Sequence, residues 1–410
     1  MILASSPFDE LKGQPKDSAK YPSSAPNDTN KIWLERVFRK HYFNYSSTIE
    51  LDEHMSQREF GFRLFDGHVR RHLNFNNKNE LIASIIKYSP SDVFCSSSRY
   101  QNPSASIDQK SWIGSDLIFD IDGKDLHLEC AKIHNLTYCK NCKLITSEVY
   151  SNCIGCKSNL IQIIEIPCHK CIKSLKLEVK KLIEILCDDF GIDNNSISIY
   201  FSGNNGFHIH VNDNKFFTSN SIKRSALTQY LLGRGYLTDN LGFRLDSSNK
   251  ITILSNKILY NVGWRARLMK QFHLQLKNHR IDDKFIKKIN YIKETSEFDL
   301  LNIINTQIEK LSVKIDPNVT IDTHRIFRLA GTINSKSGLI KFHCTDLESF
   351  NPFDDACINE DSVVEINSKI EMKLFLKGTS YKVKLGINSI PEFVAVYIIS
   401  KGIGDICIQK

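Results

Sequence analysis

Apolar and polar positions follow two different periods along this chain, and each period occupies its own segments. In the first, apolar side chains recur every three or four positions, which is the spacing of one buried face of an α-helix. It predicts helices at residues 32–41, 81–88 and 172–190. In the second, apolar and polar side chains alternate, as in a half-buried strand. It predicts strands at residues 59–65, 69–75, 116–122, 197–201 and 207–211. Both periods in one chain indicate a mixed α+β fold.

Turn signals and changes of composition divide the chain into parts. Gly191 ends the third helical run, and Asp66-Gly67 separates two of the strands as a hairpin turn would. Residues 1–30 are rich in Ser, Pro, Asn and Asp and have few apolar anchors, which predicts a disordered or loosely attached arm. After residue 312 the pattern returns to short strands and turns. The expected domains are an arm at 1–30, a core at 31–216 and 313–410, an insertion at 128–174 and a helical subdomain at 217–312.

Net charge allows a polyanionic partner but does not establish one. The 410 residues include 54 Lys and Arg against 46 Asp and Glu, a formal net charge of +8. Residues 345–410 hold 7 lysines and 10 acids, a net −3, so residues 1–344 carry the remaining +11. This surplus suits nucleic acid, although many intracellular proteins are equally basic.

The apolar runs and the cysteine count indicate a compartment. The longest purely apolar run, Phe393–Ile399, is seven residues, whereas a membrane-crossing helix needs about 20. The N-terminus has no basic segment followed by an apolar one, so neither secretion nor a membrane span is expected. We expect a cytoplasmic protein whose 12 cysteines are metal ligands or reduced thiols rather than disulfides.

The strand at residues 116–122 carries paired carboxylates. Asp116, Asp120 and Asp122 project to one face, and the apolar side chains between them project to the other. Carboxylates two positions apart on a strand have Cβ atoms about 7 Å apart on the same side. That spacing suits a shared Mg²⁺ ion, which prefers a few carboxylate oxygens together with substrate phosphates. The simpler interpretation is an amphipathic strand whose solvent-facing side happens to be acidic.

A glycine turn, Ser202–Gly206, joins the last two predicted strands. Its Gly and Asn residues tolerate positive φ, so backbone N–H groups and Ser202 could approach and cradle a phosphate. His208 and His210 share one strand face, and His208 could reach a triphosphate held by the turn. The alternative is an ordinary hairpin with half-exposed histidines. A second polar cluster within 21 residues adds weight, although it could be a solvated turn: Asp316, His324, Arg325, Arg328, Asn334 and Lys336.

The cysteines have the spacing of zinc sites. An outer cluster follows the two-knuckle pattern of a zinc ribbon: Cys139, Cys142, Cys153 and Cys156. An inner cluster brackets it and could form a second zinc site at its base: Cys130, His134, Cys168 and Cys171. The alternative is a single metal, with His134 or His169 at the surface. Five cysteines have no spaced partner and are expected to be packed thiols: Cys95, Cys187, Cys344, Cys357 and Cys407.

The order of the motifs resembles one known family. QREF at residues 57–60, DLIFDID at 116–122, a Cys/His region, FSGNNGFHIHV at 201–211 and HRIFRLAGTINSKSGL at 324–339 occur in turn. They closely resemble the small catalytic subunit of archaeal and eukaryotic DNA primase, and the archaeal form fits best. The ending PEFVAVYII also looks like that family's. The resemblance covers the chain from about residue 31 to its end.

The resemblance implies an α+β primase core with a zinc-binding element and a variable helical subdomain. It implies synthesis of short RNA, or DNA, primers on single-stranded DNA from nucleoside triphosphates during replication, using two Mg²⁺ or Mn²⁺ ions. It also implies a heterodimer with a large regulatory subunit that carries an iron–sulphur cluster. Zinc is expected to be structural, because four protein ligands leave no open coordination position.

Motif matches assign roles to individual residues. Asp120, Asp122 and Asp316 would be catalytic metal ligands, with Asp322 as the rival for the third position. The nucleotide-binding set would comprise Ser202, His208, Arg328, Arg58, Lys336 and Asn334.

Three positions depart from the family pattern, which usually has basic residues where Asn204 and Asn205 stand and His where Asn334 stands. These changes remove charge from triphosphate binding, and Lys336 and Arg325 are the expected compensation.

Three other functions share parts of this pattern. A non-catalytic nucleic-acid-binding subunit would use the zinc ribbon and retain the acidic strand without activity. A repair-type polymerase of the same superfamily would extend existing primers. A metal-dependent nuclease would use the carboxylates without needing the glycine turn.

Overall fold

The computed structural model describes residues 28–147, 149–236, 241, 243–245, 251–253, 263–278 and 297–407. Its helices are α1 (Asp28–Tyr45), α2 (Lys78–Tyr88), α3 (Ala131–His134), α4 (His169–Phe190), α5 (Asn214–Phe217), α6 (Ser221–Leu231), α7 (Gly263–Asn278), α9 (Glu297–Leu311), α10 (Pro317–Ile321), α11 (Pro352–Asp355) and α12 (Glu392–Ser400). Among these described helices, none is both long and apolar enough to cross a membrane.

The strands are short. The earlier ones are β1 (Phe60–Arg63), β2 (Val69–Leu73), β3 (Asp92–Ser96), β4 (Ser98–Tyr100), β5 (Trp112–Ser115), β6 (Leu117–Asp122), β7 (Leu136–Cys139), β8 (Ile145–Thr146), β9 (Ile161–Ile164), β10 (Ile197–Phe201) and β11 (Gly206–Val211). The later ones are β12 (Phe243–Leu245), β13 (Ile251–Ile253), β14 (Ile326–Arg328), β15 (Phe342–His343), β16 (Val363–Ser368), β17 (Met372–Leu376), β18 (Thr379–Val383), β19 (Gly386–Pro391) and β20 (Gly404–Ile406). Helices and strands together confirm the α+β class.

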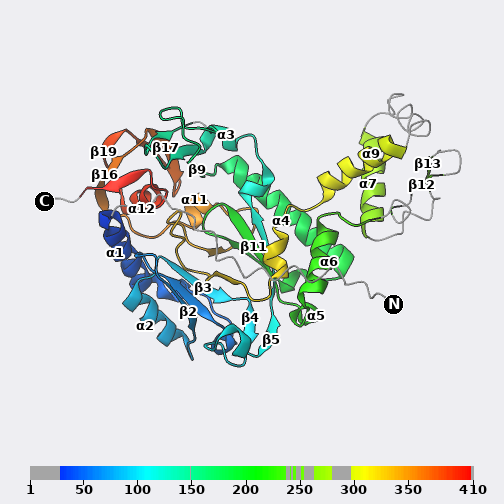
Figure 1. Cartoon of the computed structure of the whole chain (residues 1–410), viewed down its shortest axis with the longest axis horizontal. Helices are drawn as coiled ribbons and strands as arrows, with labels where there is room; N and C mark the ends of the chain where they lie inside the picture. The colour runs from blue at the N-terminus through cyan, green and yellow to red at the C-terminus, as the bar shows by residue number, and fades with distance from the viewer. Residues whose placement is uncertain are drawn as a thin grey trace, which may run out of the picture.

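Two four-stranded antiparallel sheets lie at the centre of the molecule (Figure 1). The central sheet has the order β15-β10-β11-β6, and the N-terminal sheet has the order β14-β3-β1-β2. Phe327 of β14 lies against His208 and His210 of β11, with ring centroids 5.5 Å and 6.3 Å apart. The two sheets therefore face each other, and the histidine face of the central sheet is turned toward the N-terminal sheet.

Strand β6 has the predicted division into two faces. Leu117, Phe119 and Ile121 are each at most 1% exposed and join the main hydrophobic core, to which α4 contributes Leu175 and Val179. Helix α4 ends at Gly191, which caps it in a left-handed conformation at φ 63°, as predicted. Because the apolar face of β6 packs under α4, its acidic face is directed into the space between the sheets.

The N-terminal region follows the prediction with one shift of boundary. The hairpin β1–β2 is antiparallel, and Gly67 in its turn has φ 93°. Helix α1 is longer than the predicted run and begins at Asp28, so the last three positions of the predicted arm are helical. Residues 1–27, the rest of that arm, lie outside the described residues.

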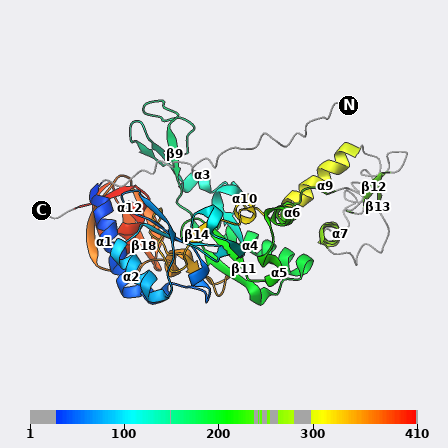
Figure 2. The same cartoon turned by 60° about the horizontal axis from the view of Figure 1, so that its bottom comes forward.

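Two elements project from the core. The insertion contains the three-stranded sheet β8-β7-β9 and stands above the central sheet (Figure 2). On another side, α7 and α9 extend away from the core beside α6 (Figure 1). Arg267 of α7 anchors this part to α4 through ion pairs with Glu184, Asp188 and Asp189 at 3.1–3.5 Å. The predicted helical subdomain also contains the antiparallel hairpin β12–β13, which the helical prediction did not include. Residues 251–253 are all β-branched, a composition that favours a strand.

The expectation of only strands and turns after residue 312 was wrong at three places, of which α12 is the largest. Residues 393–399 of this helix are at most 6% exposed on every side. A helix buried all around shows no polar face, so the periodicity that identifies amphipathic helices is missing.

Candidate active site

The central sheet brings the paired carboxylates opposite the histidine strand. In the β6–β11 register, Asp120 stands opposite His208 and Asp122 stands opposite Gly206. The His208 Nε2 atom is 3.6 Å from the Asp120 Oδ1 atom. The glycine turn and the acidic strand therefore end at the same edge of the sheet.

The third predicted aspartate lies beside this pair. The backbone N–H of Asp316 donates to the Asp120 carbonyl oxygen at 3.1 Å, and the Asp316 side chain caps α10 by accepting from the Asn318 N–H. Asp322 stands at the other end of α10, where its carboxylate accepts from the His324 N–H at 2.9 Å. The backbone thus places Asp316, rather than Asp322, against the strand of Asp120. We call Asp120, Asp122 and Asp316 the acidic cluster.

Electrostatics in the acidic cluster fit a divalent cation. Burial, together with the neighbouring Asp122 and Asp316, raises the pKa of Asp120 to about 7. Lys124 offsets part of this charge, since its Nζ lies 3.3 Å from the Asp122 carboxylate. In the described part of the chain, these three carboxylates do not converge within 4.8 Å of one another as the Cys/His groups do. The arrangement is an open set of oxygen ligands, which suits Mg²⁺ or Mn²⁺ that also bind substrate oxygens.

The glycine turn is held closed from two sides. The Ser202 N–H donates to the Gly206 carbonyl at 2.9 Å, and the Asn334 amide donates to the Ser202 carbonyl at 3.3 Å. Gly203 has φ 86°, and a Cβ there would lie 2.9 Å from the Asn334 Cβ, so this position requires glycine. The predicted nucleotide-binding residues Ser202 and Asn334 therefore form one packed unit.

His208 offers a free nitrogen at this unit. Burial lowers its pKa well below the usual value, with Lys341 and Arg328 adding to the effect, so the imidazole is neutral. Among the described residues its Nδ1 has no hydrogen-bond partner. A buried polar atom without a partner usually awaits a ligand or a water, which supports the predicted contact with substrate.

Two predicted nucleotide-binding arginines already have carboxylate partners. Arg328 pairs with the buried Asp92 at 2.7 Å, and Arg58 pairs with Asp52 and with Asp116. Their charges are therefore balanced within the protein rather than presented free. The Lys336 backbone N–H donates to the Asn334 side chain at 3.0 Å, which places Lys336 in the same turn.

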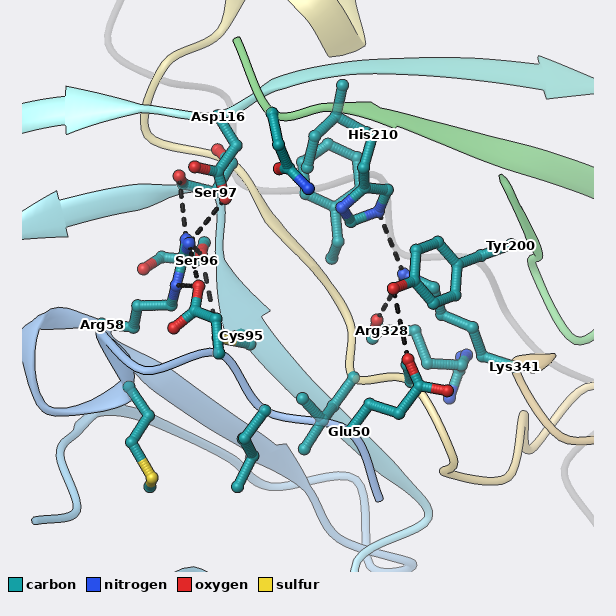
Figure 3. Close-up of a pocket in the computed structure, with 18 residues that line it drawn as sticks. Glu50, Arg58, Cys95, Ser96, Ser97, Asp116, Tyr200, His210, Arg328 and Lys341 are labelled. Carbon is teal, nitrogen blue, oxygen red and sulfur yellow. Dashed lines mark hydrogen bonds and ion pairs between the residues drawn. The ribbon is translucent and has the colours of Figure 1, made fainter. Parts of the chain in front are cut away.

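A cavity of about 210 Å³ lies between the two sheets, on the histidine face of the central sheet (Figure 3). Arg58 and Asp116 meet on one side of it, and Lys341 approaches His210 on the other, with 3.4 Å between the Lys341 Nζ and His210 Nε2 atoms (Figure 3). Burial, followed by the nearby Arg328, lowers the pKa of Lys341 to about 7.

Sequence reasoning did not assign three of these residues. Alternation had placed His210 on the same face as His208 and could have included it. Asp92 and Lys341 belong to no recognised sequence motif. Asp92 reaches the site because β3 pairs with β14, and Lys341 reaches it because the segment before β15 lies against β14.

The predicted zinc ligands converge in two groups. In each cluster, the four ligand atoms lie within 4.8 Å of one another. In the outer cluster, sulfur atoms are 3.6 Å apart for Cys139–Cys156 and 3.5 Å apart for Cys142–Cys153. In the inner cluster, the Cys171 sulfur is 3.2 Å from the His134 Nε2 atom. Four soft ligands at these spacings fit a tetrahedral zinc ion at each cluster.

Comparison with known proteins agrees with the motif order. A family model described as "DNA primase small subunit" matches residues 164–342. The DNA primase small subunit PriS of Nitrosopumilus maritimus is 36% identical over 384 residues, which are 93% of this chain and 100% of that protein. The corresponding protein of Cenarchaeum symbiosum is 32% identical over 392 residues, 92% of this chain and 99% of its own length.

Two more distant similarities were found, one to a relative and one to a solved structure. PriS of Archaeoglobus fulgidus is 28% identical over 378 residues, 91% of this chain and 97% of that protein. Among solved structures, the polymerase domain of Mycobacterium tuberculosis Ligase D in complex with DNA has a TM-score of 0.28 and 10% identity, covering 48% of this chain and 61% of that one, a similarity too low to carry an argument. From the motifs, the site and the near full-length relatives, this chain belongs to the archaeal-type DNA primase small subunit family.

Proposed function

We propose that this chain is the catalytic subunit of a DNA primase, which synthesises short RNA, or DNA, primers from nucleoside triphosphates on single-stranded DNA during replication. The observation that carries the proposal is the meeting of the acidic cluster with the glycine turn and His208 at one edge of the central sheet. A nuclease would need the carboxylates but not this turn. A non-catalytic binding subunit would need neither.

The acidic cluster would hold the catalytic cations. Two Mg²⁺ or Mn²⁺ ions bound there would activate a 3′-hydroxyl and stabilise the pyrophosphate leaving group. Asp120, Asp122 and Asp316 would supply the oxygen ligands, and the raised pKa of Asp120 reflects its burial together with the neighbouring negative charge, which a cation would offset. Asp322 is assigned no catalytic role, because it lies at the far end of α10.

The glycine turn would bind the triphosphate. Its backbone N–H groups and Ser202 can face phosphate oxygens. The Nδ1 of neutral His208, which has no partner among the residues that the structure describes, can accept or donate one hydrogen bond beside them. Asn334 fixes the turn by its bond to the Ser202 carbonyl, and Lys336 extends from the same loop.

Arg58 and Arg328 would act near the triphosphate as positioned charges rather than as free phosphate-binding groups. Each guanidinium is held in place by an ion pair with a carboxylate, so each can position the groups beside it. Either arginine could bind a phosphate only if it shared its carboxylate partner with the phosphate or released it. We infer that they shape the wall between the triphosphate and the cavity of Figure 3.

The zinc-binding insertion would be structural. Each Cys/His cluster supplies four ligands and leaves no open position for substrate. The expected partners are a large regulatory subunit in a heterodimer, single-stranded DNA and nucleoside or deoxynucleoside triphosphates. The basic balance of residues 1–344 fits a polyanionic template.

Incubation with labelled triphosphates, an unprimed single-stranded template and Mg²⁺ or Mn²⁺ tests the proposal. New short oligonucleotides, lost when Asp120 and Asp122 are both changed to Ala, are the expected result. Products formed only from supplied primers would instead indicate a repair-type polymerase. Degradation of the template would indicate a nuclease, and the absence of both activities would indicate a non-catalytic subunit.

A further inference from the structure

A buried lysine reaches the glycine turn from the far end of the chain. Lys401 follows α12 and is 6% exposed. Its Nζ donates to the Glu165 carbonyl at 2.6 Å and to the Asn204 side-chain oxygen at 2.8 Å. Both acceptors are neutral oxygens, the Tyr397 ring centroid lies 5.6 Å from the Nζ atom, and the described residues give Lys401 no ion pair. A lysine has three N–H donors, so one remains for a further acceptor.

Glu165 connects both asparagines of the turn to the base of the insertion. The Glu165 carbonyl accepts a hydrogen bond from Lys401, which also donates to Asn204. The Glu165 carboxylate accepts from the Asn205 amide at 3.2 Å. The Asn205 carbonyl in turn accepts from the Gly123 N–H at 2.8 Å, directly after Asp122. A continuous chain of hydrogen bonds thus links Lys401 to the turn and to the acidic strand.

An anion near the buried Lys401 ammonium group would lower the free-energy cost of burying its charge. Burying an ammonium group without a hydrogen-bonded counter-ion is expensive. Burial lowers the pKa of Lys401 to about 8, with Glu165 opposing the shift and Lys336 adding to it, so the group is mainly charged at neutral pH. Asn204, the turn residue that it holds, is itself neutral. A polyanion on the turn would add negative charge close to Lys401, where Glu165 is the carboxylate that already favours its charged form.

We propose that Lys401 provides positive charge to the glycine turn and fixes Asn204 for binding the triphosphate group of the nucleotide. The inference rests on the proposed function, since it names a residue of the same binding site. Lys401 acts on the turn through Asn204 and is therefore a positioning residue. It comes from a segment about 200 positions away in the sequence, which the fold brings to within hydrogen-bond distance of Asn204.

Binding of inorganic tripolyphosphate and of ATP to the purified full chain, measured by calorimetry, tests this inference without catalysis. Lys401→Met is expected to weaken binding by about tenfold or more, because a charge-assisted interaction is removed. Lys401→Arg, which keeps the charge, is expected to retain most of the affinity. Asn204→Ala, a change at a partly exposed turn position, is expected to weaken binding as well, and the double variant to be less than additive.

Lys176→Met is the matched control. Lys176, on α4, also donates to two neutral oxygens, the Glu348 and Phe350 carbonyls at 2.9 Å and 2.6 Å, but neither acceptor belongs to the turn. This variant should bind tripolyphosphate as the wild-type chain does. In primer synthesis, Lys401→Met should raise KM for the nucleotide and leave kcat within about threefold, as expected for loss of ground-state binding.

Two results would overturn the inference. One is unchanged tripolyphosphate binding in Lys401→Met and Asn204→Ala. The other is equal loss in Lys401→Met and Lys176→Met, which would indicate a general effect on stability. Failure of the proposed function is separate: it would be recorded as absence of primer synthesis by the wild-type chain, whatever its tripolyphosphate affinity.

Discussion

The acidic cluster and the two Cys/His clusters both gather metal-binding side chains from separate segments, but they hold them differently. In each Cys/His cluster, four ligand atoms already lie within 4.8 Å of one another. The carboxylates of the acidic cluster are spread along the edge of the central sheet, and Asp122 is partly neutralised by Lys124 at 3.3 Å. The Cys/His clusters can complete a coordination shell by themselves, whereas the acidic cluster needs oxygens from a substrate.

The Cys/His clusters also differ from each other. Cys171 of the inner cluster is 3% exposed in the first turn of α4, the helix that packs under the central sheet. Cys142 and Cys156 of the outer cluster are exposed on the projecting ribbon. Three candidate metal sites therefore differ in the effect expected from losing the metal: the acidic cluster would affect chemistry, the inner cluster the packing of α4, and the outer cluster the ribbon.

The largest expected effect is on the acidic cluster. Asp316→Asn should reduce nucleotide incorporation by roughly a hundredfold or more, because it removes a ligand of the catalytic cations. The thermal midpoint should change little, since repulsion among the carboxylates is relieved. Incorporation rates and melting curves measure this.

Asp322→Asn is the matched control, because Asp322 caps the opposite end of the same short helix. It should keep wild-type incorporation. Equal loss in both variants would remove the distinction between the two aspartates.

The next effect is on the inner cluster. Cys171→Ser should lose one zinc per chain and destabilise the core by roughly 3 kcal/mol or more, because a structural zinc site contributes folding free energy. Cys187→Ser, on the same helix but outside both clusters, should keep its zinc. Metal analysis and calorimetry provide the readout, and an unchanged zinc content in Cys171→Ser would contradict the assignment.

A smaller effect is expected at the outer cluster. Cys142→Ser should also lose one zinc, yet shift the unfolding free energy of the core by no more than about 1 kcal/mol, because Cys142 is exposed whereas Cys171 is buried. A core destabilisation as large as that of Cys171→Ser would show that the two clusters are not distinct in role.

The smallest effect is a pH dependence at the glycine turn. Burial lowers the pKa of Lys401 to about 8, so its charge is present below that pH and lost above it. Tripolyphosphate affinity should therefore fall by up to about tenfold as pH rises from 7 toward 10. The charged groups facing Lys401 are Glu165 and Lys336. Lys401→Arg should abolish most of the fall, because arginine stays charged; an identical fall in that variant would assign it to another group.

Local patterns predicted the parts of the site that depend on single strands. The alternation at residues 116–122 correctly divided β6 into a buried face and an acidic face, and the glycine turn was recognised from its residue types. The cysteine spacing identified both clusters that converge in space. In each case, the signal and the structure lie within a few neighbouring residues.

Contacts between distant segments could not be predicted from these patterns. The pairing of Arg328 with Asp92 depends on β14 joining β3, and that of Arg58 with Asp116 on the ends of two strands meeting. Lys401 was missed for the same reason, compounded by the absence of periodicity in the fully buried α12. The motif residues were identified, but their charge partners were not.

The most direct test of the central claim is primer synthesis by the wild-type chain on an unprimed single-stranded template, with labelled nucleoside triphosphates and Mg²⁺ or Mn²⁺, alone and with a large primase subunit. We expect labelled oligonucleotides that start without a supplied primer and disappear in the Asp120→Ala, Asp122→Ala double variant. Undiminished synthesis by that double variant, or no synthesis by the wild-type chain under any of these conditions, would contradict the claim.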